Sequence, residues 1–366
     1  MSIALISYEK NILSLIKKAM RFITVIFIWV LFSHVLFSQK KTYKIHTIAF
    51  YNLENLFDTI NDPNKNDEAS PMFKIKNNRT QVYKQKLKNL AKVISEIGTE
   101  TVSNSPTLLG VSEVENRTVL EDLIQTDLLN NNNYQIIHYD APDLRGIDVA
   151  LLYNKNEFIP IRHLSYELKI WSDKGYRIHT RDQLVVSGYL ENELIHIVVN
   201  HWPSRRGGEK RSRPLREKAA FLNKRICDSI YKKHPNSKII LMGDLNDNPT
   251  NSSLKKVLQS ETNLKKVNDT ILFNPYEILY EKGYGTLGYR DNIHLFDQII
   301  LNGSFISKDY RSLSFYKANI FNPAYLTTQT GKYKGYPFRS FSYSGFTNGY
   351  SDHYPVYIYL IKETQY

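Results

Sequence analysis

The sequence predicts a single α/β domain whose polar chemistry is gathered at the ends of buried strands. Short apolar runs of strand length alternate with longer segments in which apolar residues recur at helical spacing. Several of the apolar runs end directly in a carboxylate, amide or imidazole side chain. The 366 residues contain no internal repeat and no Gly/Ser-rich linker, which favours one domain over two.

The first half of the chain carries most of the expected strands. Alternating or continuous apolar residues predict strands at 43–51, 107–112, 134–139, 149–153, 158–169 and 178–190. Apolar positions three and four residues apart predict amphipathic helices at 81–97 and 117–129. The polar stretch 58–78 is rich in Asn, Asp and Lys, so we expect an exposed loop there.

The second half alternates strands with helices. Apolar runs predict strands at 194–200, 239–242, 295–301 and 355–360. Helical spacing predicts a long helix at 211–234 and a short one at 252–259. The only cysteine, Cys227, is expected to be a small core residue of the long helix, and no intrachain disulfide can form. Segment 315–350 is rich in glycine and aromatic residues, and we expect a loop packed on the sheet edge.

The N-terminus has the layout of a secretory signal. Basic residues precede a mostly apolar run at 22–37, and the small residue Ser38 follows it. This pattern predicts that residues 1–38 are an N-terminal extension and signal peptide cleaved after Ser38, with translation starting at Met20. The expected location is secreted, periplasmic or at the cell surface. The alternative is an uncleaved membrane anchor, because the run is near the lower limit of a span.

The formal net charge of +12 favours a polyanionic partner, such as nucleic acid or an anionic surface. The densest basic cluster runs from Arg205 to Lys218 and holds seven Lys or Arg against two Glu. This cluster could rest on a nucleic-acid backbone. The alternative is a solvated loop continued by the basic outer face of a helix.

The stretch Lys238–Thr250, KIILMGDLNDNPT, is the centre of the predicted site. Asp244 and Asn246 follow a buried strand and are two residues apart, so in extended backbone they point to the same face. Gly243 is expected to let the chain turn at this point. The alternative is a strand followed by an Asx-rich turn, and Asp247 is assigned to the turn in either case.

Other polar residues occupy the same kind of position. Strand ends also carry Asn52, Glu113, Asp148, His201, Asp352 and His353, and Asp297 lies inside the strand at 295–301. If these strands lie side by side, the side chains converge on one rim. Oxygen donors of this kind suit Mg²⁺ or Mn²⁺. Zinc is not expected, because cysteine ligands and an HExxH spacing are absent. The absence of GxxxxGK[ST] argues against an NTPase, and no nucleotide cofactor is expected.

Five motifs occur together and in a recognisable order. They are SEVEN at Glu113, NHWPS at His201, GDLND at Asp244, FDQIIL at Asp297 and SDHYPV at Asp352. This set resembles the endonuclease/exonuclease/phosphatase superfamily, which includes DNase I-like nucleases, abasic-site endonucleases, inositol polyphosphate phosphatases and neutral sphingomyelinases. FYNLENLFD near the start is similar to a secreted bacterial branch. The resemblance covers residues 44–361 and implies a DNase I-like, four-layered α/β sandwich: two packed, mainly antiparallel sheets flanked by helices.

The resemblance also implies roles for the acidic and amide residues. Asn52 and Glu113 match the metal-site pair, and Asp352 matches an acidic neighbour of that site. Asp244 matches the aspartate that orients or deprotonates the attacking water. Asn246 matches the asparagine that holds the phosphate. The implied cofactor is therefore Mg²⁺ or Mn²⁺.

The remaining roles belong to the histidines and their neighbours. His353 matches the imidazole that contacts the phosphoryl oxygens, and Asp297 matches the carboxylate that pairs with it. His201 matches the second histidine of DNase I-like and phosphatase members. Arg145 and Asp148 match more loosely. Arg145 is expected to contact a substrate phosphate, and Asp148 is expected to support that substrate-binding part of the site.

Fold and motifs imply phosphodiester hydrolysis but do not select a substrate. We expect a monomeric nuclease, specifically an endonuclease, acting on nucleic acid. In segment 315–350 aromatic residues are interleaved with Lys332, Lys334 and Arg339, which suits base stacking beside phosphate contacts and also suits a lipid interface. One alternative is a phospholipid phosphodiesterase of sphingomyelinase type, which cleaves a phospholipid head group. The other is a catalytically inactive binding protein on the same fold.

Overall fold

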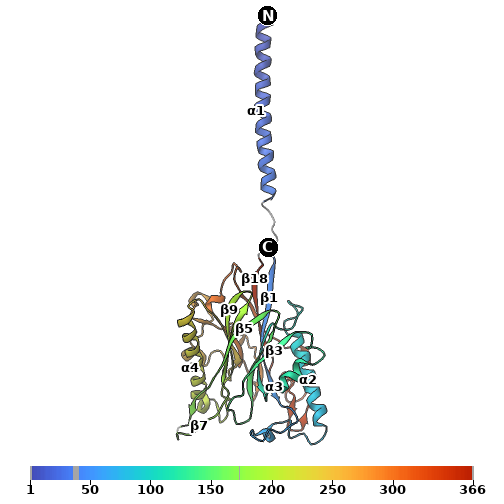
Figure 1. The fold of residues 1–366 in the computed structure, drawn as a ribbon, viewed down its shortest axis with the longest axis vertical. Coiled ribbons are helices and arrows are strands. Elements are labelled where there is room, and N and C mark those ends of the chain that lie inside the picture. The colour runs from blue at the N-terminus through green and yellow to red at the C-terminus, as the bar shows by residue number, and fades with distance from the viewer. Residues whose placement is uncertain (1, 36–40, 173, 365–366) are drawn as a thin grey trace. The chain divides into compact units, whose positions relative to one another are not determined.

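The computed structural model describes residues 2–35, 41–172 and 174–364, and the chain divides into two units (Figure 1). The smaller unit contains helix α1 (Ser2–Val35). The larger unit, Tyr43–Glu363, contains the other helices and strands of the described chain.

Helix α1 includes most of the apolar run that was predicted as the signal core. Among the described residues, no helix has the length and apolar character needed to cross a membrane. The predicted cleavage position after Ser38 lies outside the described residues.

The first sheet of the larger unit has the strand order β15–β18–β1–β2–β4–β3. Its strands are β1 (Tyr43–Leu56), β2 (Leu108–Val114), β3 (Tyr134–His138), β4 (Asp148–Asn154), β15 (Ser314–Ile320) and β18 (Val356–Glu363). β1 and β2 run parallel, and the other neighbours pair antiparallel. The register places Asn52 opposite Ser112, so Asn52 and the next residue of β2, Glu113, lie at the same end of the sheet.

The second sheet has the order β11–β14–β10–β9–β8–β5. Its strands are β5 (Phe158–Tyr166), β8 (Gln183–Leu190), β9 (Glu193–His201), β10 (Lys238–Asp244), β11 (Leu272–Phe273) and β14 (Asp297–Asn302). Only the β9–β10 pair is parallel among these described strands. The register sets Asp244 directly between His201 on one neighbour and Asp297 on the other.

The two sheets pack face to face and helices cover both outer faces. A buried apolar cluster between the sheets joins Ile48 and Phe50 of β1 to Ile197 of β9 and Met242 of β10. α2 (Arg79–Glu96) and α3 (Arg117–Ile124) pack on the first sheet, and α4 (Glu209–Lys233) packs on the second. Figure 1 shows α4 on one side of the paired sheets and α2 and α3 on the other. These layers confirm the predicted four-layered α/β sandwich.

Two glycines permit close approach inside this sandwich. A Cβ atom at Gly110 of β2 would lie 2.5 Å from the Met242 sulfur of the opposing sheet. A Cβ atom at Gly243 would lie 2.3 Å from the Asn200 carbonyl oxygen of β9. β10 continues through Gly243 to Asp244, so the prediction of a turn at Gly243 is wrong. The left-handed backbone needed to leave the strand occurs three residues later, at Asn246 (φ 50°).

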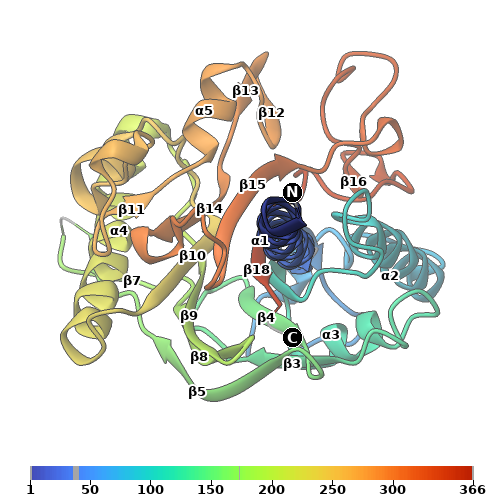
Figure 2. The same cartoon turned by 90° about the horizontal axis from the view of Figure 1, so that it is seen from above.

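Short elements complete the larger unit. They are η1 (Asp67–Ala69), β6 (Ile170–Trp171), β7 (Arg177–Ile178), the π-helix η2 (Ser253–Leu258), η3 (Leu264–Lys266), α5 (Tyr276–Glu281), β12 (Leu287–Tyr289), β13 (Asn292–His294), η4 (Gly303–Phe305), η5 (Ala324–Leu326), β16 (Phe341–Ser342) and β17 (Gly345–Phe346). Figure 2 shows β12 and β13 beside α5, and β15 next to β18. The segment expected to be a loop from 315 onward begins as strand β15, because its backbone pairs with β18 at the sheet edge.

Candidate active site

Six polar side chains from both sheets meet at one end of the sandwich. They are Asn52, Glu113, His201, Asp244, Asp297 and His353. β1, β2, β9 and β10 supply four of them near their carboxyl ends, and the start of β14 and the segment before β18 supply the other two. Five of the six are buried, and Glu113 is half-buried. The structure therefore brings together residues that the strand ends predicted to converge.

Asp244 lies at the centre of the cluster. Its Oδ2 accepts a hydrogen bond from Asn52 Nδ2 at 3.2 Å, and its Oδ1 accepts one from the Asn246 backbone N–H at 3.0 Å. His201 Nε2 is 3.5 Å from the same Oδ2, and His353 Nε2 is 4.0 Å away. Burial raises the pKa of Asp244 to about 7, although the charge of His353 opposes the shift. A carboxylate that ionises near neutral pH suits a general base.

His353 is held as an imidazolium. Its Nδ1 lies 2.7 Å from Asp297 Oδ2. Burial alone would lower the pKa of His353, but Asp297 and Asp244 outweigh burial and raise the pKa well above its usual value. Both ring nitrogens of an imidazolium are donors, so Nε2 can donate to an anionic oxygen in the site. Ser351 Oγ accepts from the His353 backbone N–H and donates to the Asn52 carbonyl, which ties this segment to β1.

His201, unlike His353, is uncharged. Burial, reinforced by Arg181 and Arg145, lowers the pKa of His201 well below its usual value. The imidazole is therefore neutral at neutral pH, with Nε2 3.9 Å from Glu113 Oε1. Its buried Nδ1 has no hydrogen-bond partner among the described residues. One neutral and one cationic imidazole thus flank the same carboxylate of Asp244.

Backbone irregularity aims Glu113 into the site. Glu113 has φ 60°, and the pairing register of β2 shifts on both of its neighbouring strands at this point. A β-bulge of this kind turns a side chain that regular pleating would direct elsewhere. Glu113 Oε2 accepts from the Asn55 backbone N–H at 3.0 Å, and Asn52 Oδ1 accepts from Glu54 N–H at 2.9 Å. Glu54 and Asn55 are also left-handed, so strained positions gather around the site.

The oxygen donors of Asn52, Glu113 and Asp244 fit a hard divalent cation such as Mg²⁺ or Mn²⁺. A second grouping could also hold an ion, because ligand atoms of Asp244, Asp297 and His353 lie within 4.8 Å of one another. We favour Asn52 and Glu113 as the metal pair. His353 is cationic and its Nδ1 is occupied by Asp297, so it would repel a metal ion instead of binding it.

Two arginines of the basic cluster at 205–218 are committed near Asn246: Arg205 binds the Asn246 carbonyl and Asp247, and Arg216 binds Asp247. Asn246 donates through Nδ2 to the Trp202 carbonyl, and Arg205 Nε donates to the Asn246 carbonyl at 2.9 Å. Arg205 Nη2 lies 3.0 Å from Asp247 Oδ1, and Arg216 Nε lies 2.7 Å from the same oxygen. Asp247 was expected to be a turn residue, but it is fully buried between the two guanidinium groups. No local sequence pattern distinguishes such an aspartate from a turn.

Arg145 and Asp148 lie beside the cluster. Arg145 is partly exposed and its Nε is 3.5 Å from Asp143 Oδ1, so its outward position is compatible with contact to a substrate phosphate. Asp148 is fully buried, and its oxygens lie near His138 Nε2 (3.1 Å) and accept from Ala141 N–H (2.8 Å). Asp148, predicted to support the substrate-binding part of the site, is bonded to the start of the loop that carries Arg145.

Arg181 is a further site residue that the sequence did not reveal. Its Nη1 donates to Asp143 at 3.0 Å and its Nη2 donates to the Trp202 carbonyl at 2.6 Å. The Trp202 carbonyl also receives Asn246 Nδ2, so Arg181 fixes the same backbone group from the other side. Burial lowers the pKa of Arg181, and its proximity helps to keep His201 neutral.

Asp352 takes part in an ion-pair network around Arg339. Arg339 Nη2 lies 3.3 Å from Asp352 Oδ2, and Arg339 Nε lies 3.4 Å from Glu54 Oε1. Glu54 is buried and accepts from the Ser340 backbone N–H, while the buried Lys86 donates to Ser340 Oγ at 2.7 Å. The ion pair of Asp352 with Arg339 anchors the segment that precedes His353, and the role of Asp352 beside the metal pair stays a prediction.

The basic cluster at 205–218 is only partly available to a ligand. Arg205 and Arg216 face Asp247, and Arg213 forms an ion pair with Glu209. The other cationic side chains of the cluster are exposed, and they are Arg206, Lys210, Arg211 and Lys218.

Five aromatic residues of segment 315–350 pack in or against the core. Those packed in or against the cluster behind the first sheet are Phe321, Tyr325, Phe341, Phe346 and Tyr350. Tyr333 and Tyr343 are exposed, and Lys332 Nζ lies 5.8 Å from the centre of the Tyr333 ring. The segment is thus largely the packed edge that the simplest interpretation predicted, with a small aromatic and basic surface.

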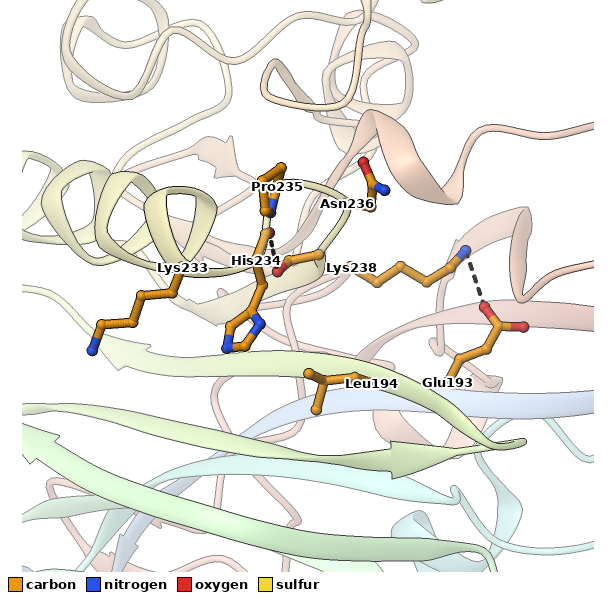
Figure 3. A pocket seen from close by; sticks show the side chains of 8 residues that line it. Glu193, Leu194, Lys233, His234, Pro235, Asn236 and Lys238 are labelled. Carbon is orange, nitrogen blue, oxygen red and sulfur yellow. Dashed lines mark hydrogen bonds and ion pairs between the residues drawn. The ribbon is translucent and has the colours of Figure 1, made fainter.

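A concave pocket of about 430 Å³ lies at the other end of β9 and β10, where these strands begin. Figure 3 shows Glu193, His234 and Lys238 among its lining residues. Lys238 Nζ donates to the Ser304 carbonyl and lies 3.5 Å from Glu193. The charge of Lys238 is therefore compensated by Glu193. The polar cluster around Asp244 is the stronger candidate for an active site.

Comparisons with known proteins agree with this architecture. A sequence profile of the Endonuclease/Exonuclease/phosphatase family matches residues 47–362. An endonuclease/exonuclease/phosphatase family protein from Bacteroides thetaiotaomicron is 15% identical, with a TM-score of 0.51 over 88% of this chain and 100% of that one. Mannosyl-6-phosphatase from the same organism is 17% identical, with a TM-score of 0.50 over 86% and 99%.

A D. rerio TDP2 structure complexed with single-strand DNA product is 12% identical, with a TM-score of 0.50 over 87% of this chain and 99% of that one. No curated protein matches the sequence significantly. At these identities the structural likenesses establish the fold.

Proposed function

Because the chain belongs to the endonuclease/exonuclease/phosphatase family, we propose that it is a divalent-metal-dependent phosphodiester hydrolase that acts as an endonuclease. The observation that carries the proposal is the surroundings of Asp244. A carboxylate with a pKa of about 7 lies between a neutral and a cationic imidazole, beside an Asn52–Glu113 oxygen pair. Hydrolysis of a phosphodiester needs a base, hydrogen-bond donors to the phosphoryl oxygens and compensation of negative charge.

In this proposal Asn52 and Glu113 hold Mg²⁺ or Mn²⁺, which supplies neutralisation of phosphoryl charge when bound. Asp244 accepts the proton of the attacking water. Asn246 orients the phosphate, because its backbone is fixed by Arg205 and its side chain by the Trp202 carbonyl. A fixed geometry of this kind lowers the entropic cost of an in-line attack.

The histidines act on the phosphoryl oxygens. His353 presents a positive charge through Nε2, and Asp297 maintains that charge from Nδ1. His201 contributes a neutral hydrogen-bonding group, because burial and the nearby arginines disfavour its protonated form. Arg145, at the partly exposed rim, contacts a neighbouring phosphate.

Nucleic acid is the proposed substrate, and three observations support it. The net charge of +12 favours a polyanion. Exposed Arg206, Lys210 and Arg211 follow the His201 strand. One protein of similar fold is described with a single-strand DNA product. We also propose export through the N-terminal signal, on the basis of the basic and apolar pattern of residues 1–38.

The test is hydrolysis by purified protein of plasmid DNA, RNA, sphingomyelin and a sugar phosphate, each with Mg²⁺ and with EDTA. We expect nicked plasmid only with the metal. Asp244→Asn should lower kcat by at least about 10³-fold, since both base catalysis and its central hydrogen bonds are removed. Asp228→Asn, which changes an exposed carboxylate paired with Lys224, is the matched control and should retain activity.

Cleavage of sphingomyelin or the sugar phosphate with intact DNA and RNA would contradict the nuclease proposal. Retained activity in Asp244→Asn would contradict the assigned base.

A further inference from the structure

The hairpin of β6 and β7 presents an indole ring to solvent. Ile170 is fully buried in the apolar cluster between the second sheet and α4, and successive residues of a strand point to opposite sides. Trp171 therefore points outward, and 50% of its surface is exposed. Ser172 N–H donates to the Tyr176 carbonyl at 2.8 Å, which extends the pairing beyond the two strands. The hairpin thus has an anchored inner side and an exposed aromatic outer side.

Trp171 is held in place from one side by Arg177. The two residues are paired directly across the strands, so their side chains share a face of the hairpin. The guanidinium carbon of Arg177 lies 4.8 Å from the centre of the Trp171 ring. Arg177 Nη2 in turn lies 2.7 Å from Glu167 Oε1 and donates to the Leu168 carbonyl at 3.3 Å. A fixed cation thus covers one face of the indole, and the exposed part of the ring lies on the side away from it.

The hairpin is attached to the active-site end of the second sheet. Ile170 shares its apolar cluster with Trp202, the residue that follows His201. Shortly after β7, Arg181 donates to the Trp202 carbonyl. Figure 1 shows β7 at the tip of the larger unit, near one end of α4. The hairpin is therefore fixed to the segment that leads from His201 into the basic cluster at 205–218.

We propose that Trp171 stacks on an unpaired base of a nucleic acid, which makes single strands the preferred substrate class. This inference rests on the proposed nuclease function and deepens it. Every base has a π-face, so an aromatic side chain can stack on a base of any sequence. Bases inside a duplex are already stacked on their neighbours, so only an unpaired base can offer a face to the indole.

Charge and shape favour a nucleic acid over a lipid surface. Segment 167–177 carries three cations against two carboxylates, and the exposed Lys169 and Lys174 lie on either side of Trp171 in the sequence. Binding to a membrane surface grows with the apolar area that is inserted. The other large aromatic residue of the hairpin, Tyr176, precedes Arg177 and so points away from the Trp171 face. A single indole beside lysines therefore suits a base flanked by phosphates.

The experiment compares a single strand that has bases with one that lacks them. Full-length Asp244→Asn protein is titrated by fluorescence anisotropy into a labelled single-stranded DNA and into an abasic strand of equal length. Trp171→Ala in this background should raise the Kd for the strand with bases about 10-fold, which is within the range for one lost base stack. The Kd for the abasic strand should not change. Trp171→Phe should restore most of the lost affinity, because a phenyl ring also stacks.

Tyr189→Ala in the same background is the matched control. It removes a partly exposed aromatic side chain that pairs with Leu194, at the opposite end of β9 from His201. This change should leave the Kd for both strands unaltered.

An unchanged Kd in Trp171→Ala would overturn the proposal, as would an equal loss of affinity for both strands. Weaker binding of Trp171→Ala to phosphatidylserine vesicles, with unaltered DNA binding, would assign the hairpin to lipid instead. If wild-type protein cleaves nucleic acid while Trp171→Ala binds the strand with bases normally, the stacking alone is refuted. If wild-type protein neither binds nor cleaves nucleic acid, the proposed function fails as well.

Discussion

At the scale of single residues, the pairing of Asp297 with His353 decides the charge of the site. Burial alone favours a neutral imidazole, and the two nearby carboxylates reverse that preference. Asp297→Asn should therefore lower the pKa of His353, so the imidazolium deprotonates at lower pH. We expect the basic limb of the kcat–pH profile to move down by roughly one unit or more, with kcat reduced about 10²-fold. Asp228→Asn should leave the profile in place, and an unshifted basic limb in Asp297→Asn would show that His353 does not act as an imidazolium.

At the scale of elements, Arg205 joins the loop that leads into α4 to the segment that follows β10. Its guanidinium binds both the Asn246 carbonyl and Asp247, and it lies 4.5 Å over the Phe296 ring. Arg205→Ala should lower kcat about 30-fold while KM changes little, because Asn246 is displaced and every group that touches the substrate is still present. In an Asn246→Ala background, Arg205→Ala should lower kcat by a much smaller factor, because the effects of residues that act through one another are not additive. If Arg205→Ala lowered kcat by the same factor in wild-type and Asn246→Ala protein, or raised only KM, Arg205 would contact the substrate directly. Arg225→Ala, which removes an exposed arginine of α4 with no role in the proposal, is the matched control.

Some features of the elements and their contacts could be predicted from the sequence, and others could not. The spacing of apolar residues predicted an α/β domain, and the motifs predicted the family and, through the resemblance, its four-layered sandwich; the fold and the family are confirmed. Glu113 and Asp244 converge because β2 of the first sheet and β10 of the second, facing sheet finish at the same end of the sandwich. The roles of Arg181 and Arg205 could not be predicted, because they depend on which loops pack together after the sheets form. The left-handed backbone of Glu113 has no sequence signal either, since glycine is the residue expected at such a φ.

At the scale of the whole molecule, the question is how much of the positive charge serves substrate binding. The sequence suggested that all of segment 205–218 could rest on a nucleic-acid backbone, but Arg205 and Arg216 are committed to Asp247 and Arg213 to Glu209. At the end of the segment nearest His201, the exposed cations that can approach phosphates are Arg206, Lys210 and Arg211.

Replacing these three exposed residues by alanine together should therefore weaken binding to a DNA duplex and flatten its dependence on salt. Removing one phosphate contact reduces the slope of log K against log salt by about 0.9, so we expect a change of roughly 2 to 3. Saturating kcat should stay within about twofold, because none of the three touches the Asp244 cluster. The measurement is fluorescence anisotropy of a labelled DNA duplex at roughly 50 to 300 mM salt, where counterion release is resolved. Asp244→Asn protein is used so that the duplex is not cleaved. Alanine at the exposed Lys256, Lys265 and Lys266 removes the same charge elsewhere. An equal change in slope for both triple variants would assign binding to overall charge, and the basic segment would no longer have its proposed role.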